Sequence, residues 1–359
     1  MEVWILERVM MKGNEALAEG AIRAGCRFFF GYPITPQNEV PEYMARRMPE
    51  VNGVFLQAES EVSAINMVYG AGGAGARAMT SSSSPGISLK QEGISYIAGA
   101  EVPCVIVNVS RGGPGLGGLT PSQSDYFQAT KGGGHGDYHL IVFAPGTGQE
   151  MVDLIGLAFD KAEEYRNPTM ILSDAIMGQM MEPVVLPEMR PELKEKSWAT
   201  TGKKGRVKPN VINSLGILDK DLELMNIKLQ EKYARIEANE VRYEADGTDD
   251  ADLIVVAYGT TSRVVRSALS MLREEGKKVG LLRPITLWPF PKKILGDLAA
   301  KNKRFLVVEM SSGQLVEDVI LAVNDRSKVD FYGKLNGTIP TVREVYEEIT
   351  SLLQKEGRA

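Results

Sequence analysis

"PCVIVNVS", residues 103–110, is the stretch that decides the fold class. It is apolar at consecutive rather than alternate positions, so both faces of the predicted strand are buried. That pattern is typical of a parallel sheet covered by helices on both sides. Comparable runs at 26–31, 77–82, 139–145 and 168–174 alternate with helical patterns at 14–24, 60–73, 88–99 and 149–165. We therefore predict an α/β fold with a mostly parallel sheet.

The alternation lapses after Met181 and resumes in a second unit. Residues 182–210 are rich in proline and charge and predict a linker or surface wrap, followed by a charged helix at 219–238. "ADLIVVAYG", 251–259, then opens a new series. Its further strands are predicted at 279–283 and 304–310, and its helices at 261–275, 292–301, 314–323 and 341–354. The sequence thus predicts two domains with mostly parallel sheets, residues 1–185 and 246–359, joined by residues 186–245.

The composition indicates a soluble globular protein of the cytoplasm. The 359 residues are 43% hydrophobic and 24% charged, as in ordinary globular proteins. The net charge of −5 gives no indication of a basic surface that would bind nucleic acid. No apolar run approaches the roughly 18 residues of a membrane span, and no signal peptide is expected. Met10 or Met11 could be the natural start.

Metal sites are not expected. Cys26 and Cys104 lie far apart in the sequence and form no metal-spaced pair, which favours a disulfide-free cytosolic protein. No cysteine lies near His135 and His139 to complete a zinc site. Because an iron–sulfur cluster needs about four thiolates, this chain alone cannot hold one.

Two glycine-rich stretches match G-x-G-x-x-G by letter. "GAGGAG", 70–75, follows a helical pattern, which favours a helix end and turn over a dinucleotide site. "GPGLGG", 113–118, follows a strand but lacks the acidic residue that a Rossmann unit places after its next strand. We expect the second stretch to be a mobile loop at the carboxyl end of a strand, where open α/β sheets bind ligands, or else a surface loop.

"GYPITPQNEV", 31–40, holds the first candidate site residue, Thr35. Pro33 and Pro36 stiffen this loop, so the Thr35 hydroxyl could be held for a ligand oxygen. The alternative is that Thr35 caps a helix that starts near Pro36.

Two charged residues are further candidates. Glu61, near Glu59, lies at the start of a predicted helix, where an acid is favoured by the helix dipole whatever else it does. Arg111 ends the strand 103–110 and opens the glycine loop. It could clamp a carboxylate with two hydrogen bonds, or pair with an acid on the surface.

Four stretches resemble the α subunit of the 2-oxoacid:ferredoxin oxidoreductases over most of the chain. They are "GYPITPQNEV", "QAESEVSAINMVYGAG", "SSSSPGISLKQEGISYIAGAEVPCVIVNVSRGGPGLGGLTPSQSD" and "LLRPITLWPFP". The nearest resemblance is to the branched-chain (2-oxoisovalerate) type, with the 2-oxoglutarate type close behind. It implies a pyrimidine-type thiamine-diphosphate-binding domain followed by a transketolase-C-terminal-like domain.

The resemblance also implies roles for the candidate residues. Glu61 matches the glutamate that bonds the aminopyrimidine of thiamine diphosphate and promotes its imino form. Thr35, with Pro33 in the same cofactor-binding loop, matches the threonine near the reacting carbon. Arg111 matches the arginine that binds the 2-oxoacid carboxylate. A 2-oxoglutarate enzyme needs a further cation, for which Lys131 or Arg77 could serve.

The implied enzyme is divided over several chains and acts as a hetero-oligomer. Thiamine diphosphate is shared with a β subunit that brings magnesium and a cluster, and γ and ferredoxin-like δ subunits complete the complex. Coenzyme A takes the acyl group, ferredoxin takes the electrons, and this chain is expected to be inactive alone. The rival readings are the β chain of a lipoamide-dependent dehydrogenase, a non-catalytic scaffold that keeps the fold, and a dinucleotide-binding protein. The lipoamide type would lack the Y-P-I-T-P and S-R-G-G-P-G loops, so the sequence argues against it.

Overall fold

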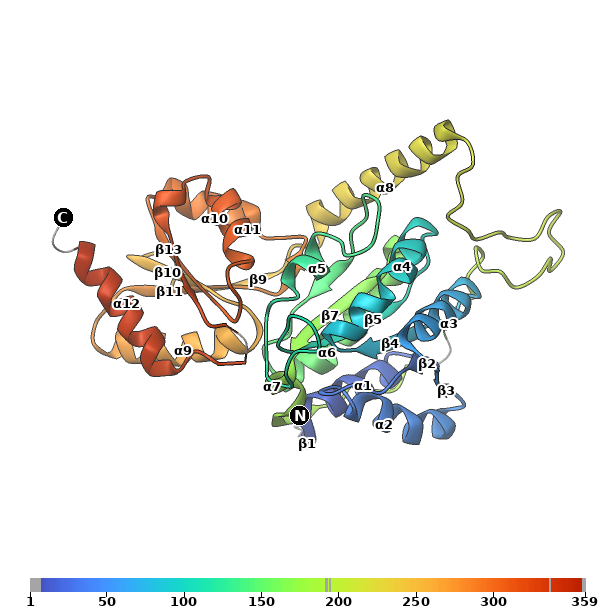
Figure 1. The fold of residues 1–359 in the computed structure, drawn as a ribbon, viewed down its shortest axis with the longest axis horizontal. Coiled ribbons are helices and arrows are strands. Elements are labelled where there is room, and N and C mark those ends of the chain that lie inside the picture. The colour runs from blue at the N-terminus through green and yellow to red at the C-terminus, as the bar shows by residue number, and fades with distance from the viewer. Residues whose placement is uncertain (1–7, 191–192, 194, 336, 357–359) are drawn as a thin grey trace, which may run out of the picture.

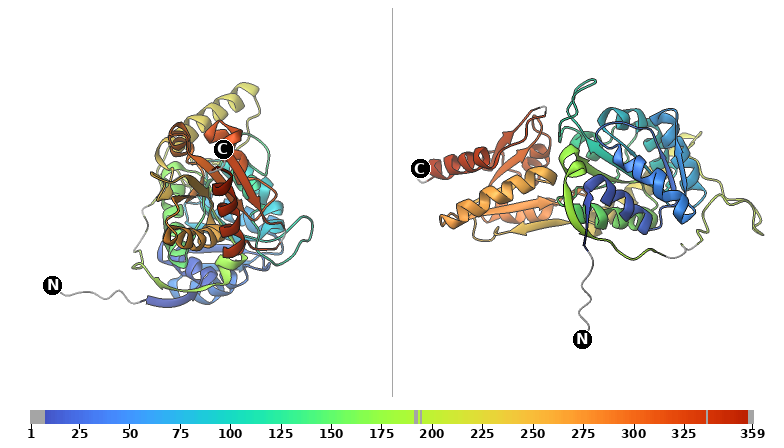
Figure 2. Two further views of the ribbon diagram at one scale, coloured as in Figure 1. Left: turned by 90° about the vertical axis from the view of Figure 1, so that its left-hand side faces the viewer. Right: turned by 90° about the horizontal axis from the view of Figure 1, so that it is seen from below.

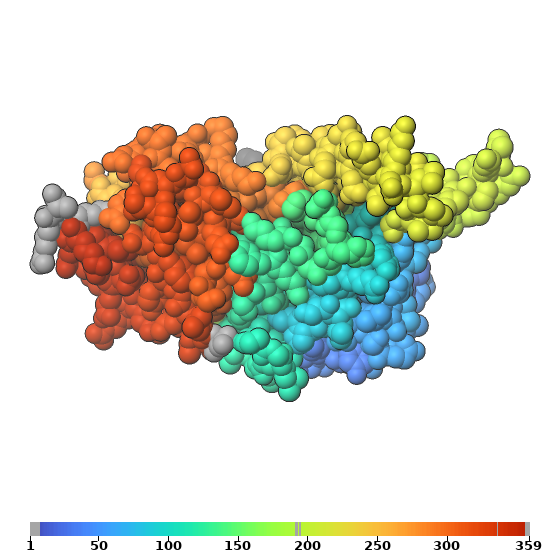
Figure 3. Space-filling view, turned by 45° about the horizontal axis from the view of Figure 1, so that its top comes forward, coloured from blue at the N-terminus to red at the C-terminus, as the bar shows by residue number. Residues whose placement is uncertain are grey.

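The computed structural model describes residues 8–190, 193, 195–335 and 337–356. Two α/β units lie side by side, the first in blue to green and the second in orange to red (Figure 1). The space-filling view shows the second unit packed closely against the first (Figure 3). Residues 1–7, which include most of the segment before Met10, lie outside the described residues.

The first unit is built on a seven-stranded sheet in the order β12-β6-β7-β5-β4-β2-β3. All neighbouring pairs are parallel except β12 with β6. The strands are β2 (Phe28–Gly31), β3 (Val54–Gln57), β4 (Ala78–Ser82), β5 (Val105–Ser110), β6 (Ile141–Phe143), β7 (Thr169–Asp174) and β12 (Thr286–Trp288). β5, the strand that decided the fold class, lies at the centre of the sheet and is buried along its whole length.

Helices cover both faces of this sheet. α3 (Glu61–Gly73) packs on α4 (Ser84–Gly99), and α1 (Gly13–Arg23) packs on α2 (Glu39–Arg47) and α6 (Gly148–Tyr165). Right-handed crossovers place α3 and α4 on one face and α2 and α6 on the other. The short α5 (Tyr126–Thr130), α7 (Ala175–Gln179) and η1 (Met48–Val51) lie in the connections, and β1 (Arg8–Lys12) pairs with β8 (Met181–Val185).

The second unit has a five-stranded sheet in the order β14-β13-β10-β11-β9. Its strands are β9 (Tyr243–Asp246), β10 (Leu253–Val256), β11 (Val279–Pro284), β13 (Arg304–Glu309) and β14 (Val329–Gly333), and only β9 runs antiparallel. α9 (Gly259–Glu274) packs on α12 (Val342–Glu356), and α10 (Lys292–Ala300) on α11 (Leu315–Val323), with η2 (Arg326–Lys328) before β14. The predicted α/β class with two mostly parallel sheets is confirmed.

The segment between the units contains an arm and one long helix. Residues 197–218 have no helix or strand. Ala199 and Thr200 lie against the first unit, the middle of the segment extends away from the body, and α8 (Asp219–Asn239) returns along the first unit (Figures 1 and 3). Val207 and Ile217 in this arm are 90% and 80% exposed. None of the helices among the described residues is long and apolar enough to cross a membrane.

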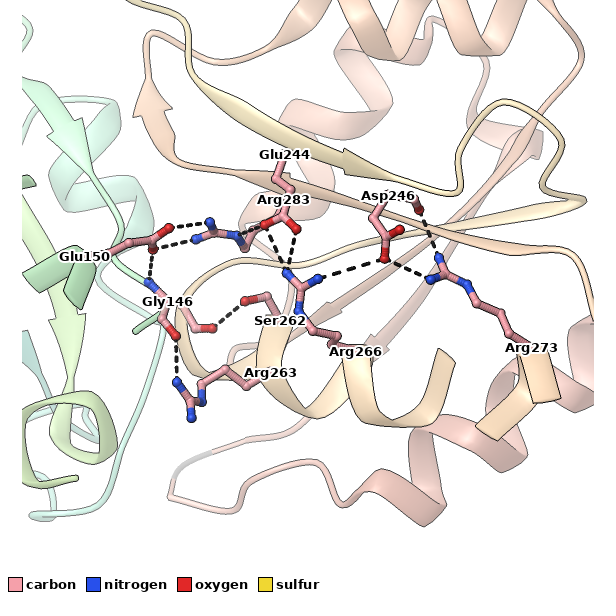
Figure 4. Close-up of polar contacts among 10 residues, drawn as sticks. Gly146, Glu150, Glu244, Asp246, Ser262, Arg263, Arg266, Arg273 and Arg283 are labelled. Carbon is pink, nitrogen blue, oxygen red and sulfur yellow. Dashed lines mark hydrogen bonds and ion pairs between the residues drawn. The ribbon is translucent and has the colours of Figure 1, made fainter. Parts of the chain in front are cut away.

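A buried arginine links the two units. Arg283 on β11 donates from Nη1 and Nη2 to Oε2 and Oε1 of Glu150 on α6, at 2.9 and 2.6 Å. Its Nε donates to Oε2 of Glu244 on β9, at 3.0 Å (Figure 4). Burial acts to lower the pKa of Arg283, but the bonds to Glu150 and Glu244 outweigh it and raise the pKa. The charge network therefore fixes how the second sheet sits on the first.

Candidate active site

The candidate residues gather round the first turn of α4. Because the carboxyl ends of parallel strands meet at one edge of a sheet, the loops after β2, β4 and β5 lie together there. The loop after β2 carries Thr35, β4 leads into Ser84 and Gly86 of α4, and Arg111 directly follows β5. Ser84 accepts a hydrogen bond from the Arg111 backbone N–H at 2.9 Å, which ties two of these loops together.

Glu61 lies at the start of α3, facing this turn. Ser60 caps the helix by accepting from the Ser63 N–H at 3.2 Å, so Glu61 occupies the first helical position. Its side chain is 6% exposed, whereas Glu59 is exposed. A Cβ added to Gly86 would stand 2.8 Å from Glu61 Oε1, so the carboxylate lies directly over α4. Within the described residues, its oxygens accept no hydrogen bond.

Arg111 is buried although it is not paired with an acid. It is 7% exposed, and its Nη1 donates to the Thr35 carbonyl at 2.8 Å while Nη2 donates to the Leu116 carbonyl at 3.1 Å. Its Nε is buried without a partner, and no carboxylate lies within ion-pair distance in the part of the chain that the structure describes. The alternative of a surface arginine paired with an acid is wrong. A buried guanidinium with an unused donor is well suited to an anionic ligand.

The Thr35 loop is held from several sides. Asn38 donates to the Thr35 hydroxyl at 3.3 Å, and the Pro36 carbonyl accepts from Asn14 at 2.9 Å. Thr35 is half-buried and Pro33 is exposed. α2 begins at Glu39 with Asn38 as its N-cap, so the alternative in which Thr35 caps a helix starting near Pro36 is wrong.

A pocket of about 750 Å³ opens between the two units beside Arg111. Asp125 lines it, with Ser84 and Gly112 from the first unit and Ser311 and Ser312 from the second. Ser84 and Asn108 both donate to Oδ2 of Asp125, at 2.6 and 2.8 Å. Burial raises the pKa of Asp125, and these two hydrogen bonds oppose the rise.

The second unit clamps the segment that carries Asp125. The Gln123 side chain donates to the Tyr258 carbonyl at 2.9 Å and accepts from the Met310 N–H at 2.9 Å. Tyr126 donates to Asp318 at 2.6 Å. One wall of the pocket is therefore positioned by the second unit.

The glycine loop after Arg111 closes on itself. Gly118 donates to the Gly112 carbonyl at 2.9 Å, and Gly112 to the Thr120 carbonyl at 2.9 Å. Gly115 and Gly117 have φ angles of 73° and 65°, which glycine adopts most readily. The loop stands out from the body beside the second unit (Figure 2, right). "GAGGAG", in contrast, is the end of α3 and the following turn, as expected.

Other charged candidates lie outside this cluster. Lys131 pairs with Asp318. Arg77 precedes β4, at the opposite edge of the sheet, and pairs with Asp160 at 2.8 Å and Glu163 at 2.9 Å. The His139 ring stacks on Trp288 with centroids 4.5 Å apart. Cys26 and Cys104 are free and buried, and burial raises the pKa of each thiol to about 12.

The sequence reasoning missed Ser84, Gly86 and Asp125. The helix predicted at 88–99 begins in fact at Ser84, so its first turn was not recognised as the centre of the cluster. The signal was present, because proline is favoured in the first turn of a helix and Pro85 occupies that turn.

Two family models match the chain and together span most of it. A family model described as "Pyruvate flavodoxin/ferredoxin oxidoreductase, thiamine diP-bdg" matches residues 19–245, more than half of the chain. A second, "Pyruvate:ferredoxin oxidoreductase core domain II", matches residues 251–345. The chain belongs to the 2-oxoacid:ferredoxin oxidoreductases. This confirms the resemblance, and members of the family act as multi-subunit enzymes.

Relatives of this 2-oxoacid:ferredoxin oxidoreductase chain are similar over nearly its whole length. The "Ketoisovalerate oxidoreductase subunit VorB" of Methanothermobacter thermautotrophicus is 53% identical over 95% of this chain and 96% of its own. The "2-oxoglutarate synthase subunit KorA" of Methanothermobacter marburgensis is 37% identical over 96% of this chain and 99% of its own. The solved 2-oxoglutarate:ferredoxin oxidoreductase from Magnetococcus marinus, with 2-oxoglutarate, coenzyme A and succinyl-CoA bound, superposes with a TM-score of 0.85 at 29% identity. That match covers 96% of this chain and 65% of the solved chain, which is longer.

The residues present fit the thiamine diphosphate that the family model names. The Glu61 carboxylate has no hydrogen-bond donor among the described residues, and its Oε1 lies only 2.8 Å from where a Cβ on Gly86 would stand. A buried polar group without a partner is costly, so a ligand donor is expected to complete it. The aminopyrimidine of thiamine diphosphate offers such a donor.

Proposed function

We propose that this chain is the α subunit of a 2-oxoacid:ferredoxin oxidoreductase that acts on 3-methyl-2-oxobutanoate (2-oxoisovalerate). The reaction is the oxidative decarboxylation of the 2-oxoacid, with transfer of the acyl group to coenzyme A and of electrons to ferredoxin. The observation that carries the proposal is the pair of buried, unpaired charges, Glu61 and Arg111, on either side of the first turn of α4. The 53% identity to a ketoisovalerate oxidoreductase subunit supports the substrate.

Each site residue has a distinct task in this proposal. Glu61 hydrogen-bonds the aminopyrimidine ring and holds the proton that this ring exchanges. Arg111 binds the carboxylate of the 2-oxoacid through its free Nε–H side. Thr35 places its hydroxyl beside the substrate. Its main-chain carbonyl already accepts a hydrogen bond from Arg111 at 2.8 Å, which holds the loop in place. Pro33 lines the exposed side of the same loop toward the cofactor.

Thiamine diphosphate, when bound, supplies the nucleophile and the electron sink for decarboxylation. The chain has only two cysteines, both buried, so the iron–sulfur clusters belong to partner subunits. We assign the diphosphate, its magnesium ion and a cluster to a β subunit, with γ and ferredoxin-like δ subunits completing a cytoplasmic complex. The isolated chain is then inert.

The 2-oxoglutarate reaction is the second candidate, because relatives named 2-oxoglutarate synthase subunits are also similar over most of their length. That substrate needs a second cation for its distal carboxylate. Lys131 and Arg77, the two candidates in this chain, form ion pairs elsewhere. A 2-oxoglutarate enzyme would therefore have to take that cation from another residue or another subunit.

The test is an anaerobic assay of the complex that co-purifies with this chain. Coenzyme-A-dependent reduction of viologen or ferredoxin is measured with pyruvate, 2-oxoisovalerate, 2-oxoglutarate and an aryl pyruvate. Preference for 2-oxoisovalerate supports the proposal, and preference for 2-oxoglutarate selects the second candidate. No reduction from an intact complex that contains thiamine diphosphate and clusters would leave a non-catalytic scaffold as the answer.

A further inference from the structure

The hydroxyl of Ser84, in the first turn of α4, joins the two ends of the glycine loop. Its Oγ accepts a hydrogen bond from the Arg111 main-chain N–H at 2.9 Å, where the loop begins. It donates to Oδ2 of Asp125 at 2.6 Å, just after the point where the returning chain pairs Pro121 with Arg111. The Arg111 carbonyl lies farther from this hydroxyl, at 3.2 Å, and a hydroxyl has only one proton to donate. The proton therefore goes to Asp125, which leaves the oxygen free to accept from Arg111.

The Asp125 carboxylate serves neither of the usual purposes of an acid at a helix start. Asp125 occupies the N-cap position of α5, yet its side chain makes no capping hydrogen bond. Among the described residues it forms no ion pair. Its Oδ2 instead accepts from Ser84 on α4 and, at 2.8 Å, from Asn108 on β5. The 2.6 Å bond to Ser84 has the length of a hydroxyl that donates to a carboxylate, about 2.5–2.7 Å.

The main chain beside Asp125 is fixed by the second unit. The Gln123 N–H donates to the Met310 carbonyl at 2.9 Å, and the Ser124 carbonyl accepts from the Gln314 side chain at 2.8 Å. These bonds add to those of the Gln123 side chain described above. The carboxylate is therefore a fixed point against which the Ser84 hydroxyl is oriented.

Arg111 depends on this point more than its other contacts suggest. One of the two carbonyls that its guanidinium holds belongs to Leu116, at 3.1 Å, and Leu116 lies in the glycine loop itself with 87% of its surface exposed. That contact moves with the loop. The bond from the Arg111 N–H to Ser84 ties the residue to α4 instead. A displacement of about 1 Å at a group that positions a substrate can cost a factor of about 100.

We propose that Asp125 is a positioning residue for the 2-oxoacid: through Ser84 it holds the main chain of Arg111 where the guanidinium meets the substrate carboxylate. The inference rests on the proposed function, in which Arg111 binds that carboxylate. Asp125 itself touches neither the reacting atoms nor the cofactor in this account. Its loss should therefore affect the KM for the 2-oxoacid much more than kcat or the binding of thiamine diphosphate.

The test is steady-state kinetics of the intact complex with 2-oxoisovalerate, together with calorimetric titration of thiamine diphosphate. Asp125→Ala removes the carboxylate, whereas Asp125→Asn keeps an oxygen that can accept from Ser84. Ser84→Ala breaks the same connection at its other member, so the inference stays testable if one variant fails to assemble. Asp125→Ala is also combined with Ser84→Ala and with Arg111→Ala, and thermal unfolding confirms that each variant is folded.

Glu240→Ala is the matched control. Glu240 is also a buried acid of the first unit, 2% exposed, and it accepts from Tyr165 at 2.9 Å and pairs with Lys161 at 2.7 Å. These partners lie near the end of α6, at the opposite edge of the sheet from Arg111. Its removal disturbs a buried hydrogen-bonded carboxylate without touching the pocket.

We expect Asp125→Ala and Ser84→Ala each to raise the KM about 5- to 20-fold, with kcat changed less than about threefold and cofactor binding unchanged. Asp125→Asn should raise the KM less than about threefold, and the Asp125–Ser84 double variant no more than the larger single change. In the Arg111→Ala background, Asp125→Ala should add nothing.

Four results would overturn the inference: an unchanged KM in Asp125→Ala, an equal rise in Asp125→Asn, an equal rise in Glu240→Ala, or a rise that persists without Arg111. The proposed function fails in a different way. If Arg111→Ala alone leaves the KM at the wild-type value, the role of Arg111 in that function is wrong, and the role of Asp125 falls with it.

Discussion

Replacing Gly86 by alanine should weaken cofactor binding without removing any polar group. The added methyl would stand 2.0 Å from Ser82 Oγ, 2.8 Å from Glu61 Oε1 and 3.0 Å from Glu61 Cγ. Neither side chain can stay where it is at such distances. Ser82 is fully buried and has no hydrogen-bond partner for its hydroxyl, so both Ser82 and Glu61 must rotate.

The magnitude follows from the cost of overpacking a well-packed site, about 1–3 kcal/mol. Because the far ends of two side chains can yield while the backbone stays, we expect the strain to fall mainly on the position of Glu61. If the whole of this strain energy weakens binding, the dissociation constant for thiamine diphosphate rises about 5- to 150-fold, since about 1.4 kcal/mol corresponds to a factor of ten. The melting temperature should change little.

Gly70→Ala is the matched control. Gly70 lies on α3, exposed, and an added Cβ there would meet nothing within 4 Å. Alanine in a helix interior is favoured over glycine by up to about 1 kcal/mol, so this variant should be as stable as the wild type or more so, with unchanged binding. Isothermal titration of the complex with thiamine diphosphate and calorimetric unfolding separate the two effects. If Gly86→Ala bound the cofactor as tightly as Gly70→Ala, Glu61 would not be held against α4 as we argue.

Three further substitutions test the site and the junction. Glu61→Gln should leave the complex assembled and reduce turnover about 100-fold or more, because the proton-holding charge is lost; turnover at the wild-type rate would exclude the role. Arg111→Ala should raise the KM for the 2-oxoacid about 10- to 100-fold, because it removes a hydrogen bond to a charged group, whose free energy corresponds to a factor of that size. An unchanged KM would mean that another cation binds the carboxylate. Arg283→Met should lower the free energy of unfolding by about 2–3 kcal/mol. Breaking a fully buried ion pair costs about 3–5 kcal/mol. The expected loss is smaller because Glu150 and Glu244 keep 25% and 34% of their side chains exposed. Its control adds Glu150→Gln in the same chain, which removes the acid that loses its cation, whereas Glu244 keeps its ion pair with Arg266 at 2.8 Å. Equal stability of Arg283→Met and the wild type would contradict this account.

The central strands and the long helices could be predicted because their signal is local. A buried parallel strand such as β5 is apolar at every position, and a long amphipathic helix repeats its pattern over several turns. The class and the order of these elements follow from that alone. The division at residues 185 and 245 stays a prediction, although β9 begins at Tyr243, within the expected linker.

Elements defined by distant partners could not be predicted. β12 has three residues and becomes a strand only because it pairs with β6, more than a hundred residues earlier. β9 likewise depends on β11, and β3 on β2. Short strands of this kind carry too few residues for a pattern of their own.

The site could be predicted as a set of residues but not as an arrangement. Thr35, Glu61 and Arg111 were identified from their motifs, and burial now separates Glu61 from its neighbour Glu59. Nothing in the motifs shows that Arg111 holds the Thr35 carbonyl or that Ser84 joins Asp125 to Arg111, because these contacts join separate segments of the chain. Their roles in catalysis stay predictions until the variants are measured.

The edge strand β12 bears on how far the chain can be divided. Although two family models share the sequence between them, the outermost strand of the first sheet comes from the second half. A fragment that stops before Thr286 would leave β6 as an apolar, unpaired edge, which is a template for aggregation. The two halves are therefore not modules that could be exchanged or expressed independently, and a gene split between them would have to yield chains that reassemble across this strand.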